Sequence, residues 1–133
     1  MQLDVSDLIG TPFVDGGRDP ATGLDCWGLF MVVMCRIGQP VPDYEISCFD
    51  SSEIGKAARH TLATQWQRTD KPGPGVGVTL EIDHKKKNCM QHFGVCINKH
   101  KFIHTLMKTG CIITSLNDRY WSKRIKGLYK WKK

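Results

Sequence analysis

The chain has 133 residues, 41% of them hydrophobic and 24% charged, and a formal net charge of +6 at pH 7. These values are typical of one soluble domain with one hydrophobic core, so we expect a single domain over residues 1–133. The longest nearly uncharged stretch, residues 26–35, is too short to cross a bilayer. The first residues lack the basic and apolar segments of a signal peptide, so we expect synthesis in the cytoplasm and no membrane partner.

Cysteine usage indicates a reduced protein. The cysteines are scattered, several of them in apolar runs, in a chain without a secretion signal. Most are therefore expected to be small buried residues, Cys35, Cys96 and Cys111 among them.

The positive charge is concentrated in residues 85–87 and 123–133. Solvated loops and a solvated terminus explain such charges most simply, and the alternative is a polyanionic partner, either nucleic acid or an acidic cell-wall polymer. Aromatic and basic residues alternate at 129–132, but that alternation is also typical of a strand with one buried face. An anionic wall polymer is therefore kept as a candidate partner, whereas nucleic acid is not favoured.

The first strong element is a helix. Residues 1–9 have only a modest helical pattern and are followed by a turn-rich loop that extends to Pro20. Asp25 is a favourable N-cap, the residues after it are almost all apolar, and Gly38 is a typical stop. These signals predict a helix over residues 26–37.

The second half of the chain has the pattern of a sheet. A second amphipathic helix is expected over residues 51–67, with Trp66 on its apolar face. After a segment rich in Pro and Gly, short strands are predicted at residues 76–82, 91–98, 101–106, 111–116 and 126–131. This order predicts an α+β fold in which the helix of Cys26 packs on an antiparallel sheet of about five strands.

Cys26 has the surroundings of a nucleophile. A free thiol with a pKa near 8.5 is only slightly ionised at neutral pH, but the first turn of a helix favours the thiolate through the helix dipole. The backbone amide of Cys26 is then a natural donor to an oxyanion, and Asp25 supports it as the cap of the same turn.

Two histidines are candidate partners of that thiol. The short link at residues 98–101 predicts a hairpin, which would set His92 and His104 on neighbouring strands. His92 would accept and return the proton, while His104 would fix its tautomer. The other histidines, His60, His84 and His100, are interpreted as surface residues.

A zinc site is the main chemical alternative, because Cys89, His92, His100 and His104 could supply four ligands. Cys89 follows a lysine run, no second cysteine pair is present, and ligation by His92 would remove the base. We therefore expect neither a metal nor another cofactor.

The chain resembles the NlpC-like cell-wall cysteine endopeptidases, particularly the branch carried by phage tails. The resemblance follows the order of the chain and covers most of it. The matching blocks are residues 10–13, 16–17 and 23–29 for the nucleophile signature, 92–95 for the base, 102–105 for the third polar residue, and the extended segment 40–44.

This resemblance implies a papain-like fold and a metal-free triad of Cys26, His92 and His104. It also implies hydrolysis of the D-γ-glutamyl–diamino acid bond in the peptidoglycan stem, at the virion tail or the host cell wall, with other tail proteins as partners. Trp27 and Phe13 become candidate substrate contacts. The chain departs from many relatives at Phe13, where they have a tyrosine whose hydroxyl helps to bind the oxyanion.

Two further functions remain open for this scaffold. One is a non-catalytic tail or cell-wall-binding module, which the missing tyrosine hydroxyl at Phe13 would fit. The other is an acyltransferase or amidase, although related lipid-modifying enzymes often place the histidine before the cysteine, whereas Cys26 comes first here.

Overall fold

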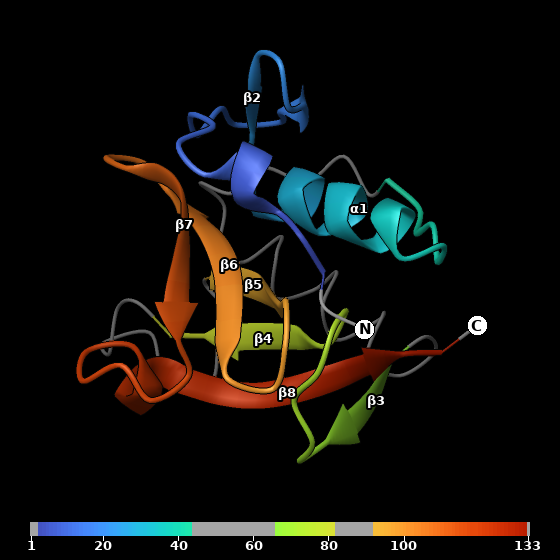
Figure 1. Cartoon of the computed structure of the whole chain (residues 1–133), viewed down its shortest axis with the longest axis vertical. Helices are drawn as coiled ribbons and strands as arrows, with labels where there is room; N and C mark the ends of the chain where they lie inside the picture. The colour runs from blue at the N-terminus through green and yellow to red at the C-terminus, as the bar shows by residue number, and fades with distance from the viewer. Residues whose placement is uncertain (1–2, 44–65, 82–91, 133) are drawn as a thin grey trace.

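The structure is a computed structural model that describes residues 3–43, 66–81 and 92–132. One helix lies against a strongly curved antiparallel sheet (Figure 1). The elements in chain order are η1 (Ser6–Leu8), β1 (Arg18–Asp19), β2 (Gly23–Leu24), α1 (Cys26–Arg36), β3 (Trp66–Thr69), β4 (Gly77–Leu80), β5 (His92–Cys96), β6 (Lys101–Leu106), β7 (Gly110–Ser115), η2 (Ser122–Arg124) and β8 (Ile125–Trp131). The expected α+β architecture is confirmed.

The main sheet has six strands in the order β3-β8-β4-β5-β6-β7. Each pair of neighbours is antiparallel, and β1 with β2 forms a separate small ribbon before the helix. Within the described residues the sheet therefore has one strand more than the five predicted, and the additional strand is β3.

Helix α1 begins at the predicted residue and ends one residue before the predicted end. The Asp25 side chain accepts a hydrogen bond from the backbone N–H of Gly28, which caps the first turn. At the other end Ile37 is the C-cap, and Gly38 has a φ of 80°, a left-handed conformation that suits glycine. No helix in the described ranges is long and apolar enough to cross a membrane.

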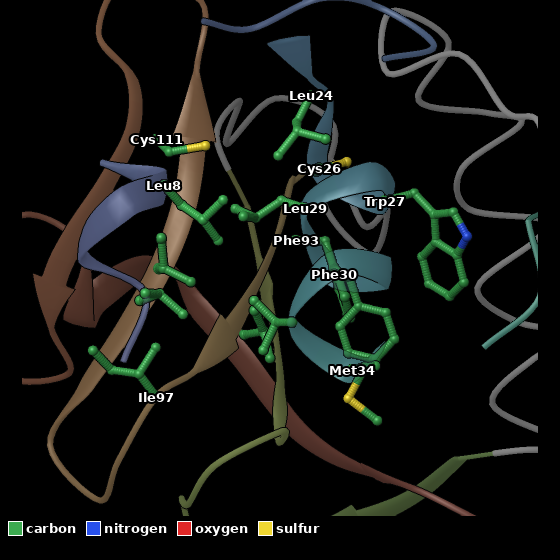
Figure 2. Packing of buried hydrophobic residues seen from close by; sticks show 14 of the residues in the cluster. Leu8, Leu24, Cys26, Trp27, Leu29, Phe30, Met34, Phe93, Ile97 and Cys111 are labelled. Carbon is green, nitrogen blue, oxygen red and sulfur yellow. The ribbon is translucent and has the colours of Figure 1, made fainter. Parts of the chain in front are cut away.

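The two faces of the sheet carry two apolar clusters. Side chains alternate along a strand, so Phe93 and Val95 of β5 face α1 and join its Leu29 and Phe30 in the larger cluster. Figure 2 shows this cluster, with Phe93 beside the helix. The opposite face carries a smaller cluster that includes Cys96 of β5 and Phe102 of β6, packed against Trp121.

Two expectations from the sequence are wrong. Trp66 lies not on a helix but in β3, where it pairs with Trp131 of β8 and is 5% exposed. The pairing joins segments far apart in the chain, and such a tertiary contact overrides a local helical pattern. Cys35, near the end of α1, is exposed rather than buried, because it lies on the side of the helix away from the sheet. The remainder of the predicted second helix, residues 51–65, lies outside the described residues.

Candidate active site

The loop before α1 is fastened by one buried carboxylate. Asp25 is fully buried, and its Oδ1 accepts hydrogen bonds from the Gly28 N–H at 2.8 Å and from Arg18 Nη1 at 2.7 Å. Its Oδ2 accepts from the Gly16 N–H at 2.9 Å. Three segments, the loop, strand β1 and the helix, therefore meet at Asp25, which holds the first helical turn in one place.

Glycine is required where this loop crosses the helix. A Cβ atom on Gly28 would fall on the carbonyl oxygen of Gly17, so any side chain there would displace the loop. The Gly17 carbonyl also accepts hydrogen bonds from Arg18 Nη1 and from the Asp25 N–H. Gly28 thus allows the backbone of α1 to approach the backbone of the loop at Gly17 closely.

Cys26 is the first residue of α1 and is 7% exposed. The first N–H groups of a helix have no partner within the helix ladder, and the helix dipole is positive at this end. Both features favour a thiolate on Cys26 over a neutral thiol. The negative charge of Asp25 acts against this effect, and its ion pair with Arg18 offsets that charge.

The histidine half of the site lies on β5 and β6. His92 is the first residue of β5, and its Nε2 lies 2.8 Å from Nδ1 of His104 on β6. The two histidines are 6% and 0% exposed. Their expected placement on neighbouring strands is therefore confirmed, and the rings share a direct hydrogen bond. Because Nε2 of His92 is used in this way, its Nδ1 is the nitrogen that remains for the thiol.

Gly94 makes room for this hydrogen bond. His92, Gly94 and His104 lie on the same face of the sheet, since side chains alternate along each strand and Phe93 faces the helix. A Cβ atom on Gly94 would come within 3.2 Å of the Cβ of His104 and 2.9 Å of the Phe102 ring. A side chain there would push the His104 ring away from His92.

Two more residues complete the histidine half, and sequence reasoning missed both. Thr114 of β7 is 7% exposed, and its Oγ1 lies 2.8 Å from Nε2 of His104. The Trp121 ring packs on both imidazoles, with centroids 5.8 Å from His92 and 4.8 Å from His104. Asp118 fixes the turn that carries Trp121 by accepting its backbone N–H at 2.9 Å. In the sequence, the only signal for these contacts is Thr114 itself, a polar residue in the largely apolar segment that forms β7.

Burial keeps the two rings neutral. Burial lowers the pKa of His92 well below its ordinary value, and the neighbouring His104 lowers it further. Burial also lowers the pKa of His104, against a smaller opposing effect of the Asp118 carboxylate. At neutral pH His92 is therefore an uncharged imidazole, the form that can accept a proton from a thiol.

A ring contact joins the two elements that carry Cys26 and His92. Trp27 of α1 and Phe93 of β5 have ring centroids 6.0 Å apart, and Cys26 belongs to the same buried cluster. Cys26 precedes Trp27 and His92 precedes Phe93, so the thiol and the imidazole are each next in the chain to one member of this ring pair. Figure 2 shows Cys26 at the start of the helix with Trp27 and Phe93 nearby.

The two residues predicted to contact substrate differ in position. Trp27 is 7% exposed, packs against Phe30 with centroids 5.0 Å apart, and donates from Nε1 to the Pro42 carbonyl at 2.9 Å. This position favours a structural role for Trp27. Phe13 is half-buried and forms an isolated bridge with Leu24, two residues before Cys26, so it borders the nucleophile loop.

The four described cysteines are thiols in different settings. Burial raises the pKa of Cys96 to about 11 and also raises the pKa of Cys111. Both therefore remain protonated at neutral pH. Cys35 is exposed and lies in the last turn of α1, at the end of the helix opposite to Cys26.

No group of three or more metal-binding side chains comes together in the part of the chain that the structure describes. His104 is buried and hydrogen-bonded at both nitrogens, whereas His100 is exposed in the turn after β5. Cys89, the remaining ligand of the zinc alternative, lies outside the described residues.

Comparison with known proteins places the chain in a family. The sequence pattern of the NlpC/P60 family matches residues 10–130. The chain is 23% identical to the gamma-DL-glutamyl hydrolase of Bacillus subtilis (strain 168) over 131 residues, which cover 96% of this chain and 28% of that protein.

Two solved structures share the fold. One is a lipoprotein-like protein of the NLP/P60 family from Staphylococcus aureus subsp. aureus Mu50, with a TM-score of 0.63, 17% identity, and coverage of 100% of this chain and 44% of the other. The other is NlpC2 from Trichomonas vaginalis, with a TM-score of 0.65, 17% identity, and coverage of 92% and 44%. The chain thus spans less than half the length of these relatives, and it belongs to the NlpC/P60 family.

Proposed function

We propose that this chain is a cysteine peptidase that cleaves the peptidoglycan stem peptide at the bond between D-γ-glutamate and a diamino acid. The observation that carries the proposal is the buried hydrogen bond between His92 and His104, next to the strand position that meets the Cys26 helix. Membership of the NlpC/P60 family supports it, as does the likeness to a protein named as a gamma-DL-glutamyl hydrolase.

The reaction follows from the roles of the three side chains. His92 Nδ1 takes the proton of the Cys26 thiol, and the thiolate attacks the γ-carbonyl carbon of the substrate. His92 then gives the proton to the leaving amine, so the C–N bond breaks and a thioester remains on Cys26. Water, deprotonated by His92, hydrolyses the thioester and restores the thiol. His104 keeps the His92 ring in one orientation throughout.

The oxyanion formed during attack needs a hydrogen-bond donor. The backbone N–H of Cys26 is proposed as this donor, because N–H groups in the first turn of a helix point beyond its N-terminus, where the helix dipole favours an anion. Phe13 borders the same loop but has no hydroxyl, so the second donor found in many relatives is missing from its side chain. We therefore expect turnover to be slow rather than absent.

The direct test is cleavage of a defined stem peptide. Purified protein is incubated with a peptide that contains the D-γ-glutamyl–diamino acid bond, and new termini are identified by mass spectrometry. We expect cleavage at that bond, loss of cleavage in Cys26→Ala, and normal cleavage in Cys35→Ala, an exposed thiol of the same helix. Cleavage that survives in Cys26→Ala, or none by the native chain, would contradict the proposal.

A non-catalytic wall-binding or tail module is the second candidate, and the missing hydroxyl at Phe13 is the observation that favours it. Such a module would bind intact cell walls without releasing peptide termini. The same incubation, followed by sedimentation of the walls, distinguishes the two functions.

We also propose that the chain acts at a phage tail or at the host wall, where its basic residues hold an anionic wall polymer. The last strand and its surroundings carry Lys123, Arg124, Lys126 and Lys130, all in the described residues. Binding to intact walls should then weaken strongly with salt, because charges are screened over about 10 Å at 0.1 M. Cleavage of a small soluble peptide, which lacks the polymer, should vary little with salt.

A further inference from the structure

His104 makes a hydrogen bond with each of its two ring nitrogens. Nδ1 faces His92 Nε2 at 2.8 Å, and Nε2 faces the Thr114 hydroxyl at 2.8 Å. Burial favours neutral rings at this position, and a neutral imidazole carries one proton. His104 therefore donates a hydrogen bond to only one of Thr114 and His92 and accepts a hydrogen bond from the other.

Only one of the two proton arrangements suits a base at His92. If the Thr114 hydroxyl donated to His104, Nδ1 of His104 would carry the proton and donate to His92 Nε2. The proton of neutral His92 would then be on Nδ1, which could not accept a proton from Cys26. If instead His104 donates from Nε2 to Thr114, its Nδ1 accepts from His92, and Nδ1 of His92 is left with a lone pair.

We propose that Thr114 is a positioning residue that sets this proton arrangement by accepting a hydrogen bond from Nε2 of His104. This inference rests on the proposed function, in which His92 is the base for Cys26. Thr114 does not touch the reacting atoms and acts only through His104.

The sheet register explains why Thr114 is suited to this role. His104 pairs with Ile112 and Phe102 pairs with Thr114 across β6 and β7, so Thr114 is the diagonal neighbour of His104 on the same face. Thr114 is 7% exposed, and Trp121 packs edge-on against the His104 ring with centroids 4.8 Å apart. Water is thus a poor substitute for the hydroxyl at Nε2.

The matched variants are Thr114→Val, which removes the hydroxyl at nearly constant shape, and Thr114→Ser, which keeps it. Thr105→Val is the control, because Thr105 is also buried but lies on the other face of β6. On a stem peptide, Thr114→Val should lower kcat about tenfold with KM unchanged, the effect of losing one buried hydrogen bond. Thr114→Ser and Thr105→Val should remain close to the native chain.

Two readouts need no substrate. The first is the rate of Cys26 alkylation against pH, which reports how readily His92 takes the thiol proton. Among the described residues, the other titratable groups that act on the two rings are each other and the Asp118 carboxylate, which is unchanged in these variants. Thr114→Val should shift the alkylation curve to higher pH, because a His104 without its acceptor is a poorer partner for protonated His92. Thr114→Ser should not shift it.

The second readout is the histidine tautomer, measured by long-range ¹H–¹⁵N correlation in the native chain. We expect the His104 proton on Nε2 and the His92 proton of the neutral pair also on Nε2. A proton on His104 Nδ1 in the native chain would overturn the proposal whether or not the variants fold. The proposal would also be overturned if folded Thr114→Val kept the histidine tautomers of the native chain and its alkylation curve did not shift.

These readouts separate this inference from the proposed function. If the native chain cleaves no stem peptide but Thr114→Val changes the tautomers and shifts the curve, Thr114 has its assigned role and the substrate is wrong. If alkylation of Cys26 is unaffected by His92→Ala, the proposed base is wrong and the role of Thr114 fails with it.

Discussion

The two halves of the site are held together by different interactions. Around Cys26, the buried carboxylate of Asp25 is hydrogen-bonded to Arg18 and to two backbone N–H groups, so charge and close backbone packing fix Cys26. Around His92, neutral rings are hydrogen-bonded along His92, His104 and Thr114, and they are fixed by strand register and by the Trp121 ring that packs on them. The surroundings of Cys26 should therefore be most sensitive to loss of a charge. The pair of His92 and His104 should be most sensitive to pH and to the position of its protons.

The largest expected effect is on activity, and it distinguishes the role of His92 from that of His104. Removing the base in His92→Ala should lower kcat/KM by more than about a thousandfold, because the thiol then loses its proton acceptor. His104→Asn, which can still bond to His92, should keep a measurable fraction of activity. Steady-state kinetics on a stem peptide checks both, with His100→Ala as the exposed control. Complete loss in both variants with intact folds would show that His104 does more than orient the base.

Loss of the buried Asp25 charge should have the largest effect on stability. Asp25→Ala removes the helix cap and leaves Arg18 without its buried partner, so the free energy of unfolding should fall by about 3 kcal/mol. Asp43→Ala is the matched control, since Asp43 pairs with the same Arg18 at 3.0 Å but its side chain is 36% exposed. It should cost less than about 1 kcal/mol. Equal losses in chemical denaturation would contradict a special role for the buried carboxylate.

The histidine half should make stability depend on pH. Burial lowers the pKa of His92 and His104 in the folded chain, whereas both have ordinary values near 6.5 when unfolded. Below that value the unfolded chain binds more protons, so the stability present at higher pH is lost as the pH falls. Each ring should contribute a slope of about 1.4 kcal/mol per pH unit.

Denaturation at several pH values between 4 and 7 measures this slope. The double variant His92→Gln, His104→Gln removes both titrating groups and should show a much flatter dependence. An unchanged slope in that variant would mean that other groups control the acid sensitivity.

The smallest expected effect is a gain. Phe13→Tyr adds a hydroxyl beside the nucleophile loop and should raise kcat by up to about tenfold, because a second donor would stabilise the oxyanion. Phe13→Leu, which adds no donor, should show no gain. If Phe13→Tyr leaves kcat unchanged, the Phe13 side chain does not border the reacting carbonyl.

Local signals were enough to predict the helix that begins at Cys26. Asp25 caps α1 and Gly38 ends it, and both effects act within one turn of the residues concerned. The strands of the second half were also found, with shifts of a residue or two at their ends, because their alternation is local. The neighbouring placement of His92 and His104 followed from a short turn between their strands.

Contacts between distant segments could not be predicted. Strand β3 forms by pairing with β8, where Trp66 lies opposite Trp131, and the sequence next to residue 66 does not indicate this distant partner. Thr114 and Trp121 reach the histidines through sheet register and a turn held by Asp118. The exposure of Cys35 depends on which side of α1 the sheet covers, which an almost uniformly apolar helix does not reveal.

The proposed reaction requires that His92 activates Cys26, and the pH dependence of thiol alkylation measures this activation. Modification of each cysteine is followed by mass spectrometry in the folded native chain and in His92→Ala. We predict that Cys26 reacts with a midpoint well below the ordinary thiol value of about 8.5, and that His92→Ala moves the midpoint upward. Cys96 and Cys111 should react only after unfolding. A Cys26 midpoint at the ordinary value, unchanged in His92→Ala, would contradict the activation of Cys26 by His92.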